Sequence, residues 1–233
     1  MDAVIFSEHA SDAAYSRLKT DILQGVFKPG EKLLMSNMKE RYSLGVGPMR
    51  EVLARLVAER LVSAINQKGY RVVSMSLSEM RDIYEARAHL EAMIVGLAIQ
   101  RGGDAWEASI IASSHTLSKV VELNSPQEMV EIWDSRHKAF HSAIASGCGS
   151  KSLLQARSFL LDQAERYRQI WLRRTVLSEE ALRLKRHEHA CLVDTILARD
   201  SDKAAQLMLD HLMTPVSIIT KIVETDGGRW HFE

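Results

Sequence analysis

Four histidines in the second half of the sequence have the spacing expected of a metal site. His137 and His141 are four residues apart in RHKAFHSAI, so on a helix they project from one side, about one turn apart. His189 and His211 lie in two later segments, where apolar neighbours at helical spacing place both imidazoles toward the interior. Burying four neutral imidazoles together is costly unless they share a partner. A divalent metal ion is such a partner, and helical bundles build metal sites from inward side chains of facing helices.

The residue types limit the choice of metal but leave the ligand set open. Imidazole-rich coordination favours Zn²⁺ or Ni²⁺ over Mg²⁺ or Ca²⁺, which prefer oxygen ligands. Asp134 precedes His137 by three residues and shares its face, so it either ligates the metal or orients a ligand. His187 lies about 200° from His189 around a helix, so only His189 is expected inside. A single inward histidine more often donates a hydrogen bond to a carbonyl, so the metal hypothesis depends on all four converging.

The histidines must be positioned by helices, because the chain from Ser76 onward has the patterns of an all-helical domain. Two capping boxes, Ser76 with Glu79 and Ser125 with Glu128, each predict a helix start. The first of these helices is predicted to end at Gly102-Gly103, and the second at the SGCGS break. Other helices are predicted at about 104–123, 151–173, 179–199 and 203–224. The sequence therefore predicts an antiparallel bundle of six to seven helices over residues 75–233.

The first 74 residues predict a separate, smaller domain. A helix is expected from Ser11 or Asp12 to Gly25, and Ser36 is expected to cap a short second helix, NMKERY. A third helix is predicted over GVGPMREVLARLVAERL, residues 45–61, and the segments VSAI and YRVVSM around NQKG then suit a two-stranded hairpin. Three short helices followed by a hairpin have the order of a winged helix-turn-helix. The fold class expected for the whole chain is all-α with a small β wing.

Cations in this first domain are candidates for DNA contact. Residues 1–74 contain 11 Lys and Arg against 8 Asp and Glu, a charge of +3, whereas the whole chain has no net charge. The third helix would enter the major groove from its N-terminal end, which makes its arginine the candidate for base or phosphate contact. Cations on the preceding helix and on the wing would contact phosphates or the minor groove. The candidate DNA-binding residues are Lys39, Arg41, Arg50, Lys68 and Arg71.

Composition restricts the cellular setting. The only two cysteines, Cys148 and Cys191, have no short spacing, which favours a reducing compartment over a disulfide framework. The N-terminus has no apolar core of signal-peptide length, and no apolar run approaches the roughly 20 residues that span a bilayer. The expected location is therefore the cytoplasm.

Several spaced motifs together resemble the GntR family of bacterial transcription regulators, in its FadR-like branch with an FCD effector domain. YSLGVGPMREVLARLVAERLV resembles the family's recognition segment, in which Pro48, Arg50 and Glu51 match, and NQKGYRV matches its wing. YEARAHLEAM resembles the helix that bears the family's arginine followed by Leu-Glu, and AFHSAIASG resembles its Phe-His segment. The 22-residue step from His189 to His211 equals the usual interval between its last two metal-binding histidines. The resemblance implies a dimeric, DNA-binding regulator with a metal-containing effector domain, and not an enzyme.

The sequence departs from the family pattern at both sites. The family usually places an aspartate four residues before the Phe-His histidine, and this sequence has His137 there. The site is then either a four-histidine site or one in which Asp134 takes part. The recognition helix often begins with an arginine and a threonine, whose positions here are Val46 and Gly47. Base reading must then depend on Arg50, its neighbours and the wing.

The resemblance also implies an effector. At finer grain the chain is similar to a carbon-starvation regulator of this branch, which implies a repressor of glutarate and γ-aminobutyrate catabolism that glutarate releases. One carboxylate of such a diacid would bind the metal, and the other a cation. Arg87 matches the family's arginine, although it could instead pair with Glu91, and Tyr167 and Arg168 are further candidates. Two alternatives stay open: a regulator that senses the metal itself, and a histidine-metal hydrolase, for which no general base has an assignable place.

Overall fold

The computed structural model describes residues 2–66, 68–125, 128–175 and 179–225. They divide into two compact units, and the chain passes from the first to the second between Met80 and Arg81. No helix among these residues is both long and apolar enough to cross a membrane. The C-terminal DGGRWHFE segment, which the sequence predicts as a loose tail, lies outside the described residues.

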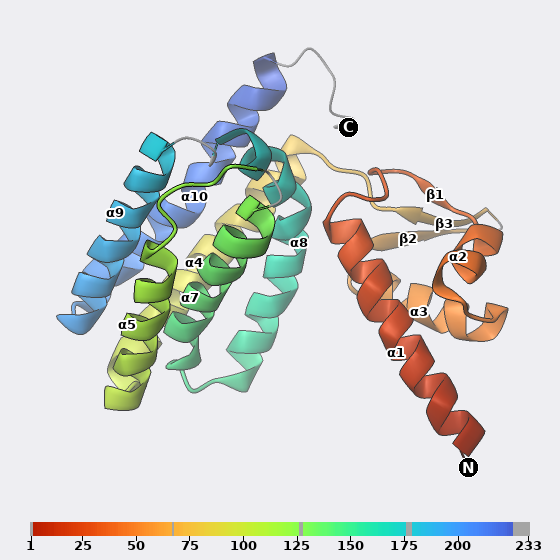
Figure 1. The fold of residues 1–233 in the computed structure, drawn as a ribbon, viewed down its shortest axis with the longest axis horizontal. Coiled ribbons are helices and arrows are strands. Elements are labelled where there is room, and N and C mark those ends of the chain that lie inside the picture. The colour runs from red at the N-terminus through yellow and green to blue at the C-terminus, as the bar shows by residue number, and fades with distance from the viewer. Residues whose placement is uncertain (1, 67, 126–127, 176–178, 226–233) are drawn as a thin grey trace. The chain divides into compact units, whose positions relative to one another are not determined.

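The first unit is a winged helix-turn-helix, which confirms the predicted fold class. Its helices are α1 (Asp2–Leu23), α2 (Met35–Tyr42) and α3 (Val46–Ala58), and its strands are β1 (Lys32–Leu33), β2 (Val62–Ile65) and β3 (Gly69–Val72). The strands form one antiparallel sheet in the order β1-β3-β2, beside α2 and α3 in Figure 1. The sheet therefore has one strand more than the predicted hairpin. Gly30, with a φ of 76°, supplies the turn that brings β1 beside β3.

The apolar stripe of α3 forms the core of this unit. Met49, Val52, Leu53 and Leu56 are all fully buried, as predicted. The main contact of α3 is with α1, which contributes Leu18. This packing leaves the opposite face of α3, which carries its arginines, in solvent. A helix with one face buried and one cationic face exposed is what a DNA-reading element requires.

Three predicted helix ends in this unit are wrong. The first helix begins at Asp2 and not near Ser11, because no Gly or Pro interrupts the preceding residues. Ser36 does not cap α2: the N-cap position is Leu34, and the Ser36 hydroxyl donates to Asn37 instead. The third helix stops at Ala58, before the predicted end at residue 61, since Arg60 adopts a left-handed φ of 56°.

The second unit is the predicted helical bundle. It contains α4 (Leu77–Arg101, which starts in the first unit), α5 (Asp104–Ser118), a π-helical turn η1 (Met129–Asp134), α7 (Ser135–Ser146), α8 (Lys151–Thr175), α9 (Glu179–Leu197) and α10 (Ser201–Thr225). The helix α5 packs on α7 and α9, and α10 packs on α8 and α9. Figure 1 shows these helices as one bundle. The facing sides of α7, α9 and α10 therefore point into one interior, where the histidines lie.

The serine caps of both predicted capping boxes form. The backbone N–H of Glu79 donates to the Ser76 hydroxyl at 3.1 Å, and that of Glu128 donates to the Ser125 hydroxyl at 3.1 Å. The Glu128 carboxylate also accepts from the backbone N–H of Asn124, the residue before the cap, at 2.8 Å. Local sequence therefore sets the starts of these two segments.

The middle of the bundle differs from the prediction at two places. The helix that starts at Asp104 ends at Ser118 and not near Leu123. Arg136 Nη1 donates to the Thr116 carbonyl at 3.0 Å and so satisfies one of the carbonyls in its last turn. The segment predicted as one helix from residue 125 to the SGCGS break is helical over residues 128–146, but residues 129–134 form a π-helical turn before α7. π-Helical turns often occur at functional sites, and this one directly precedes the first two histidines.

Trp106 anchors the C-terminal end of α7. Its indole N–H lies 3.0 Å from the carbonyls of both Ala143 and Ile144. The ring lies against Gly102 and Gly147, where a Cβ would come within 2.2 and 2.5 Å of ring atoms. The close fit of the indole on two glycines holds the histidine-bearing helix in position.

Candidate metal centre

The structure brings the four predicted histidines together. His137 and His141 come from α7, His189 from α9 and His211 from α10, and each offers one ring nitrogen within 4.8 Å of the other three. Three of the four are 5% exposed or less, and the His211 side chain is 9% exposed. The neighbouring His187 is exposed, as the helical wheel predicts. Convergence of all four is what the metal hypothesis requires.

The rings pack directly on one another. His137 and His141 have ring centroids 4.5 Å apart, and their Nε2 atoms are 3.1 Å apart. His189 and His211 have ring centroids 4.9 Å apart, and His211 stacks on His141 at 5.1 Å. This geometry leaves the imidazoles as one another's main neighbours.

Burial keeps these histidines neutral. It lowers the pKa of His137, His141 and His189 well below the ordinary 6.5, and the positive charge that the other histidines and nearby arginines would contribute lowers each pKa further. The pKa of His211 is also lowered by burial, although the hydrogen bond to Glu188 partly opposes the shift. A neutral imidazole has a free lone pair, which is the form that binds a metal.

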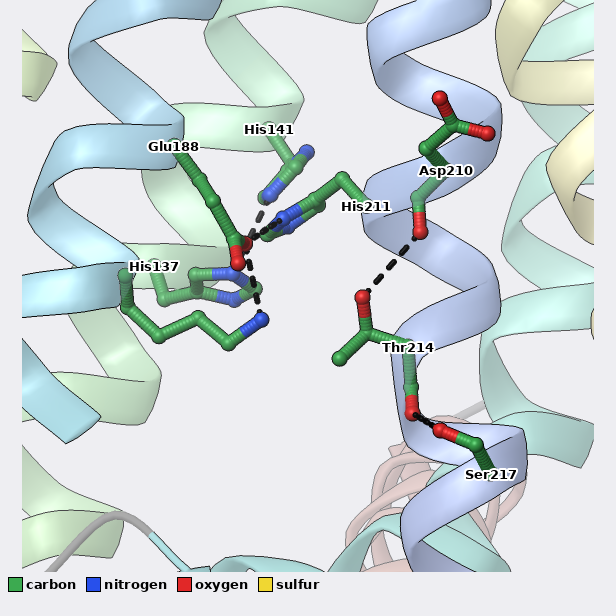
Figure 2. Close-up of polar contacts among 8 residues, drawn as sticks. His137, His141, Glu188, Asp210, His211, Thr214 and Ser217 are labelled. Carbon is green, nitrogen blue, oxygen red and sulfur yellow. Dashed lines mark hydrogen bonds and ion pairs between the residues drawn. The ribbon is translucent and has the colours of Figure 1, made fainter.

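Glu188 orients His211. Its Oε2 atom lies 2.8 Å from His211 Nδ1, and Figure 2 shows this carboxylate over the rings of His211, His141 and His137. Burial raises the pKa of Glu188, but hydrogen bonds from His211 and Lys185 bring it down to about 2, so the group is a carboxylate. Since Nδ1–H donates to this carboxylate, Nε2 of His211 carries the lone pair. A carboxylate behind a histidine is the usual partner of a metal-bound imidazole.

A proline lies one turn beyond His211. Pro215 is buried inside α10 and has no N–H, so the His211 carbonyl lacks its helical hydrogen bond. Side-chain hydroxyls support the helix on either side: Thr214 donates to the Asp210 carbonyl at 3.1 Å, and Ser217 donates to the Thr214 carbonyl at 2.9 Å (Figure 2). The backbone hydrogen bonding of α10 therefore departs from the regular helical pattern beside His211.

Asp134 contacts the cluster indirectly, through ion pairs with neighbouring cations. Its carboxylate is paired with Arg168 and, at 2.7 Å, with Lys138, and it is not one of the four converging groups. Arg168 Nη2 in turn lies 2.9 Å from His137 Nδ1. Asp134 thus reaches His137 through an arginine. Trp133, from the π-helical turn, stacks on the other side of His137 with ring centroids 4.6 Å apart.

The donor set fits a divalent metal. Among the described residues, two buried ring nitrogens, His141 Nδ1 and His189 Nε2, have no hydrogen-bond partner, and unpaired buried nitrogens are costly. Four imidazoles, one of them oriented by a carboxylate, match the preferences of Zn²⁺ or Ni²⁺. The residues present would hold such an ion.

A small cavity adjoins the cluster. It has a volume of ≈ 20 Å³, which is room for about one water molecule. Three cations line it together with two of the histidines and several apolar side chains. Its lining comprises Tyr84, Arg87, Trp133, His137, Arg168, Lys185, His211, Leu212 and Pro215. Two of the predicted effector residues, Arg87 and Arg168, therefore face a common space, whereas Tyr167 is fully buried and does not line it.

Arg87 belongs to a buried ion group. Its Nε lies 3.7 Å from Glu91, and Arg157 Nε donates to the same carboxylate at 2.9 Å. All three side chains are less than 9% exposed. Desolvation lowers the pKa of Arg87, whereas Glu91 acts in the opposite direction. The predicted pair with Glu91 therefore exists, and it leaves Arg87 on the cavity wall.

The predicted DNA-binding cations have different surroundings. Lys39, Arg50 and Lys68 are exposed and make no side-chain hydrogen bond or ion pair with any described residue. Arg41 is exposed but pairs with Asp21 at 3.0 Å, and Arg71 donates to the Gly30 carbonyl at 2.9 Å. The last two side chains thus also support the fold of the first unit. Their contact with DNA stays a prediction.

Sequence reasoning missed Lys185, Glu188 and Trp133. Lys185 precedes His189 by four residues, so it lies on the same face of α9, and this spacing could have identified it. Trp133 precedes His137 by the same interval. Glu188 is adjacent to His189, and no spacing rule connects it to His211 on another helix.

A winged helix-turn-helix joined to a helical domain with an internal histidine cluster defines a class of DNA-binding regulator that responds to a small ligand. The chain belongs to the GntR family of bacterial regulatory proteins, whose model matches residues 10–72, and it carries an FCD domain over residues 82–214. It is 57% identical over 205 residues to the HTH-type transcriptional repressor GlaR of Escherichia coli (strain K12), covering 88% of this chain and 93% of GlaR. It is 33% identical to the HTH-type transcriptional regulator BphR of Paraburkholderia xenovorans (strain LB400), covering 89% and 84% of the two chains.

Solved structures show the same fold. The Escherichia coli protein McbR/YncC superimposes with a TM-score of 0.73 at 19% identity, covering 91% of this chain and 97% of that one. A GntR regulator from Rhodococcus sp. RHA1 gives 0.67 at 17% identity over the same shares. The chain is accordingly a transcriptional regulator, and its relatives and domains are those of regulators and not of enzymes.

Proposed function

We propose that this protein is a DNA-binding repressor whose FCD domain holds a divalent metal ion, Zn²⁺ in preference to Ni²⁺, and binds a small dicarboxylate that releases it from its operator. Glutarate is the best candidate, so the genes controlled would serve glutarate and γ-aminobutyrate catabolism. The observation that carries the proposal is the set of four imidazoles with nitrogens within 4.8 Å of one another beside a cavity lined by cations. The 57% identity to the repressor GlaR supports repression.

The chemistry of the cavity favours an anion with an apolar middle. Arg87, Arg168 and Lys185 supply positive charge, and Trp133 and Leu212 are among the apolar side chains of the same lining. A bound metal would supply a further positive charge for one carboxylate. Arginine pairs with a carboxylate through two parallel hydrogen bonds. A diacid with a short methylene chain matches charged ends separated by apolar walls.

DNA binding would use two copies of the winged helix-turn-helix. Regulators with this motif bind as dimers to half-sites about one helical turn apart, so a homodimer on a near-palindromic operator is expected. The acid can release the DNA only if it binds more tightly to the arrangement that does not fit the operator. Arg50, at the exposed N-terminal end of α3, is the residue expected to read bases.

Three measurements on the purified full-length protein test the proposal. Native mass spectrometry is expected to show a dimer with bound metal. Titration calorimetry on the metal-loaded protein is expected to show heat with glutarate and less with other C4–C6 diacids. Fluorescence anisotropy on a duplex selected from a random library is expected to fall when the acid is added. Absence of metal after zinc loading, or absence of heat with every diacid, contradicts the sensing half of the proposal.

A further inference from the structure

One oxygen atom links the cavity to the histidine cluster. Glu188 Oε2 accepts a hydrogen bond from Lys185 Nζ at 2.8 Å and another from His211 Nδ1 at 2.8 Å. Lys185 and Glu188 are three residues apart on α9, and His211 comes from α10. Lys185 and His211 therefore share one acceptor oxygen, and both side chains also line the cavity.

Lys185 is held by fewer polar contacts than Arg168, the other cation of the cavity that lies close to the histidines. Arg168 is bonded to Asp134 and His137, and the latter contact is 2.9 Å long. Within the described part of the chain, the polar partner of Lys185 is Glu188 alone, and the Glu188 side chain is 37% exposed. A lysine on a flexible four-carbon stem can change position more easily than a guanidinium held on two sides.

The cavity must enlarge before it can hold an acid. A volume of ≈ 20 Å³ accommodates one water molecule and not a five-carbon diacid. Withdrawing Arg168 would leave the buried carboxylate of Asp134 without one of its partners, which is costly. Withdrawing Lys185 breaks one hydrogen bond to a half-exposed carboxylate. Moving Lys185 therefore costs less free energy than moving Arg168.

We propose that Lys185 is the residue that recognises the second carboxylate of the effector. When Lys185 turns to the effector, His211 becomes the only one of the two donors that still bonds to Glu188 Oε2. The inference rests on the proposed function, in which the FCD domain holds a metal and binds a dicarboxylate. A carboxylate that accepts from the imidazole alone raises the basicity of the opposite ring nitrogen. Binding of the acid therefore strengthens His211 as a metal ligand, and the metal and the acid stabilise each other's binding.

The coupling has two measurable consequences. Linkage requires that the factor by which the acid tightens metal binding equals the factor by which the metal tightens acid binding. Selectivity also follows, since a monocarboxylate of the same chain length has no group for Lys185. Pentanoate is therefore expected to bind more weakly than glutarate and to raise the metal affinity by a smaller factor.

The test uses full-length, zinc-loaded protein and three variants. Lys185→Met removes the charge and keeps the stem, Lys185→Arg keeps the charge, and Lys221→Met is the matched control on an exposed position of α10. Calorimetry gives the affinity for glutarate and for pentanoate, and transfer of zinc to a chromophoric chelator gives the rate of metal loss with and without acid. Circular dichroism and thermal unfolding verify that each variant is folded.

For the wild type and Lys221→Met, glutarate is expected to slow zinc loss severalfold, and pentanoate is expected to slow it much less. Lys185→Met should retain zinc without acid, bind glutarate about tenfold more weakly, and show for glutarate only the small slowing of zinc loss that pentanoate gives, with no preference between the two acids. Lys185→Arg should recover part of each. Unchanged glutarate affinity and unchanged slowing in Lys185→Met overturn the inference and leave the proposed function intact. A wild type that binds no zinc or no diacid overturns both.

Discussion

Nη2 of Arg168 lies 2.9 Å from Nδ1 of His137. A guanidinium only donates hydrogen bonds, so Nδ1 must accept and the proton of the neutral ring is on Nε2. That Nε2 lies 3.1 Å from Nε2 of His141, inside the cluster that would hold a metal. Coordination through His137 Nε2 therefore requires its proton to leave, and a proton relocated to Nδ1 would face a donor. Arg168 opposes metal binding at this histidine.

Replacing Arg168 should strengthen metal binding. Arg168→Met removes a positive charge close to the ion. It also lets His137 carry its proton on Nδ1, which leaves the Nε2 lone pair for the metal, and both changes favour coordination. We expect the zinc affinity to rise about tenfold, which corresponds to about 1.4 kcal/mol, in competition with a chromophoric chelator. Arg183→Met, an exposed arginine on α9, serves as the control and should leave the affinity unchanged. A weaker affinity in Arg168→Met would mean that Arg168 supports the site and does not oppose it.

The two histidines near the middle of α9 provide a matched pair of substitutions. His189→Ala removes a buried ring of the cluster, whereas His187→Ala removes an exposed ring two residues earlier on the same helix. We expect His189→Ala to lower the zinc affinity by a factor of about 100 or more, because loss of a direct ligand should exceed the 10–100-fold cost of losing an outer partner. Zinc should raise the melting temperature of His187→Ala as in the wild type but not that of His189→Ala. Equal zinc binding by both variants would contradict the four-histidine site.

The metal-free protein should lose stability in mild acid. Burial lowers the pKa of His137, His141 and His189 in the folded state, whereas the unfolded chain titrates near 6.5. Below about pH 6.5 the unfolded state therefore binds protons that the folded state does not, and the free energy of unfolding falls as the pH falls. Each histidine contributes at most about 1.4 kcal/mol per pH unit, and the contribution is fully present above pH 6.5.

Urea unfolding in a chelating buffer between pH 8 and pH 5 measures this slope. His141→Ala should have a shallower slope than the wild type, because one of the depressed pKa values is removed. His187→Ala should retain the wild-type slope, since that ring is exposed. A slope in His141→Ala equal to that of the wild type would show that the buried imidazoles do not govern the acid response.

Local patterns in the sequence predict the elements that local interactions determine. The four-residue step between His137 and His141 and the apolar face of α3 follow from helix geometry alone. The hydrogen bonds of Ser76 to Glu79 and of Ser125 to Glu128 lie within a few residues, so their pattern was readable. Convergence of the histidines from three helices was also predictable, because each ring follows the apolar face of its own helix.

The parts that could not be predicted depend on contacts between distant segments. The strand β1 forms only because Lys32 and Leu33 find partners in β3, about forty residues later. The π-helical turn before α7 breaks a pattern that reads as continuous helix. Glu188 on α9 is hydrogen-bonded to His211 on α10. The position of Glu188 next to His189 in the sequence does not indicate that it contacts a histidine of another helix. These features are set by tertiary packing, which overrides local preference.

DNA recognition by α3 should depend on Arg50. Its side chain is exposed near the N-terminal end of the helix and is not paired with any described residue. We expect Arg50→Ala to weaken binding to a selected duplex by about 1–3 kcal/mol, and binding to a scrambled duplex by less, in anisotropy titrations at fixed salt. Arg55→Ala is the control, because that guanidinium pairs with Asp12 at 2.6 Å and lies 3.8 Å from the centre of the Tyr15 ring. It should lower the stability of the unit and leave the preference between duplexes unchanged. An equal loss on both duplexes in Arg50→Ala would assign Arg50 to the phosphate backbone, and base reading would then have to come from other residues of α3 or from the wing.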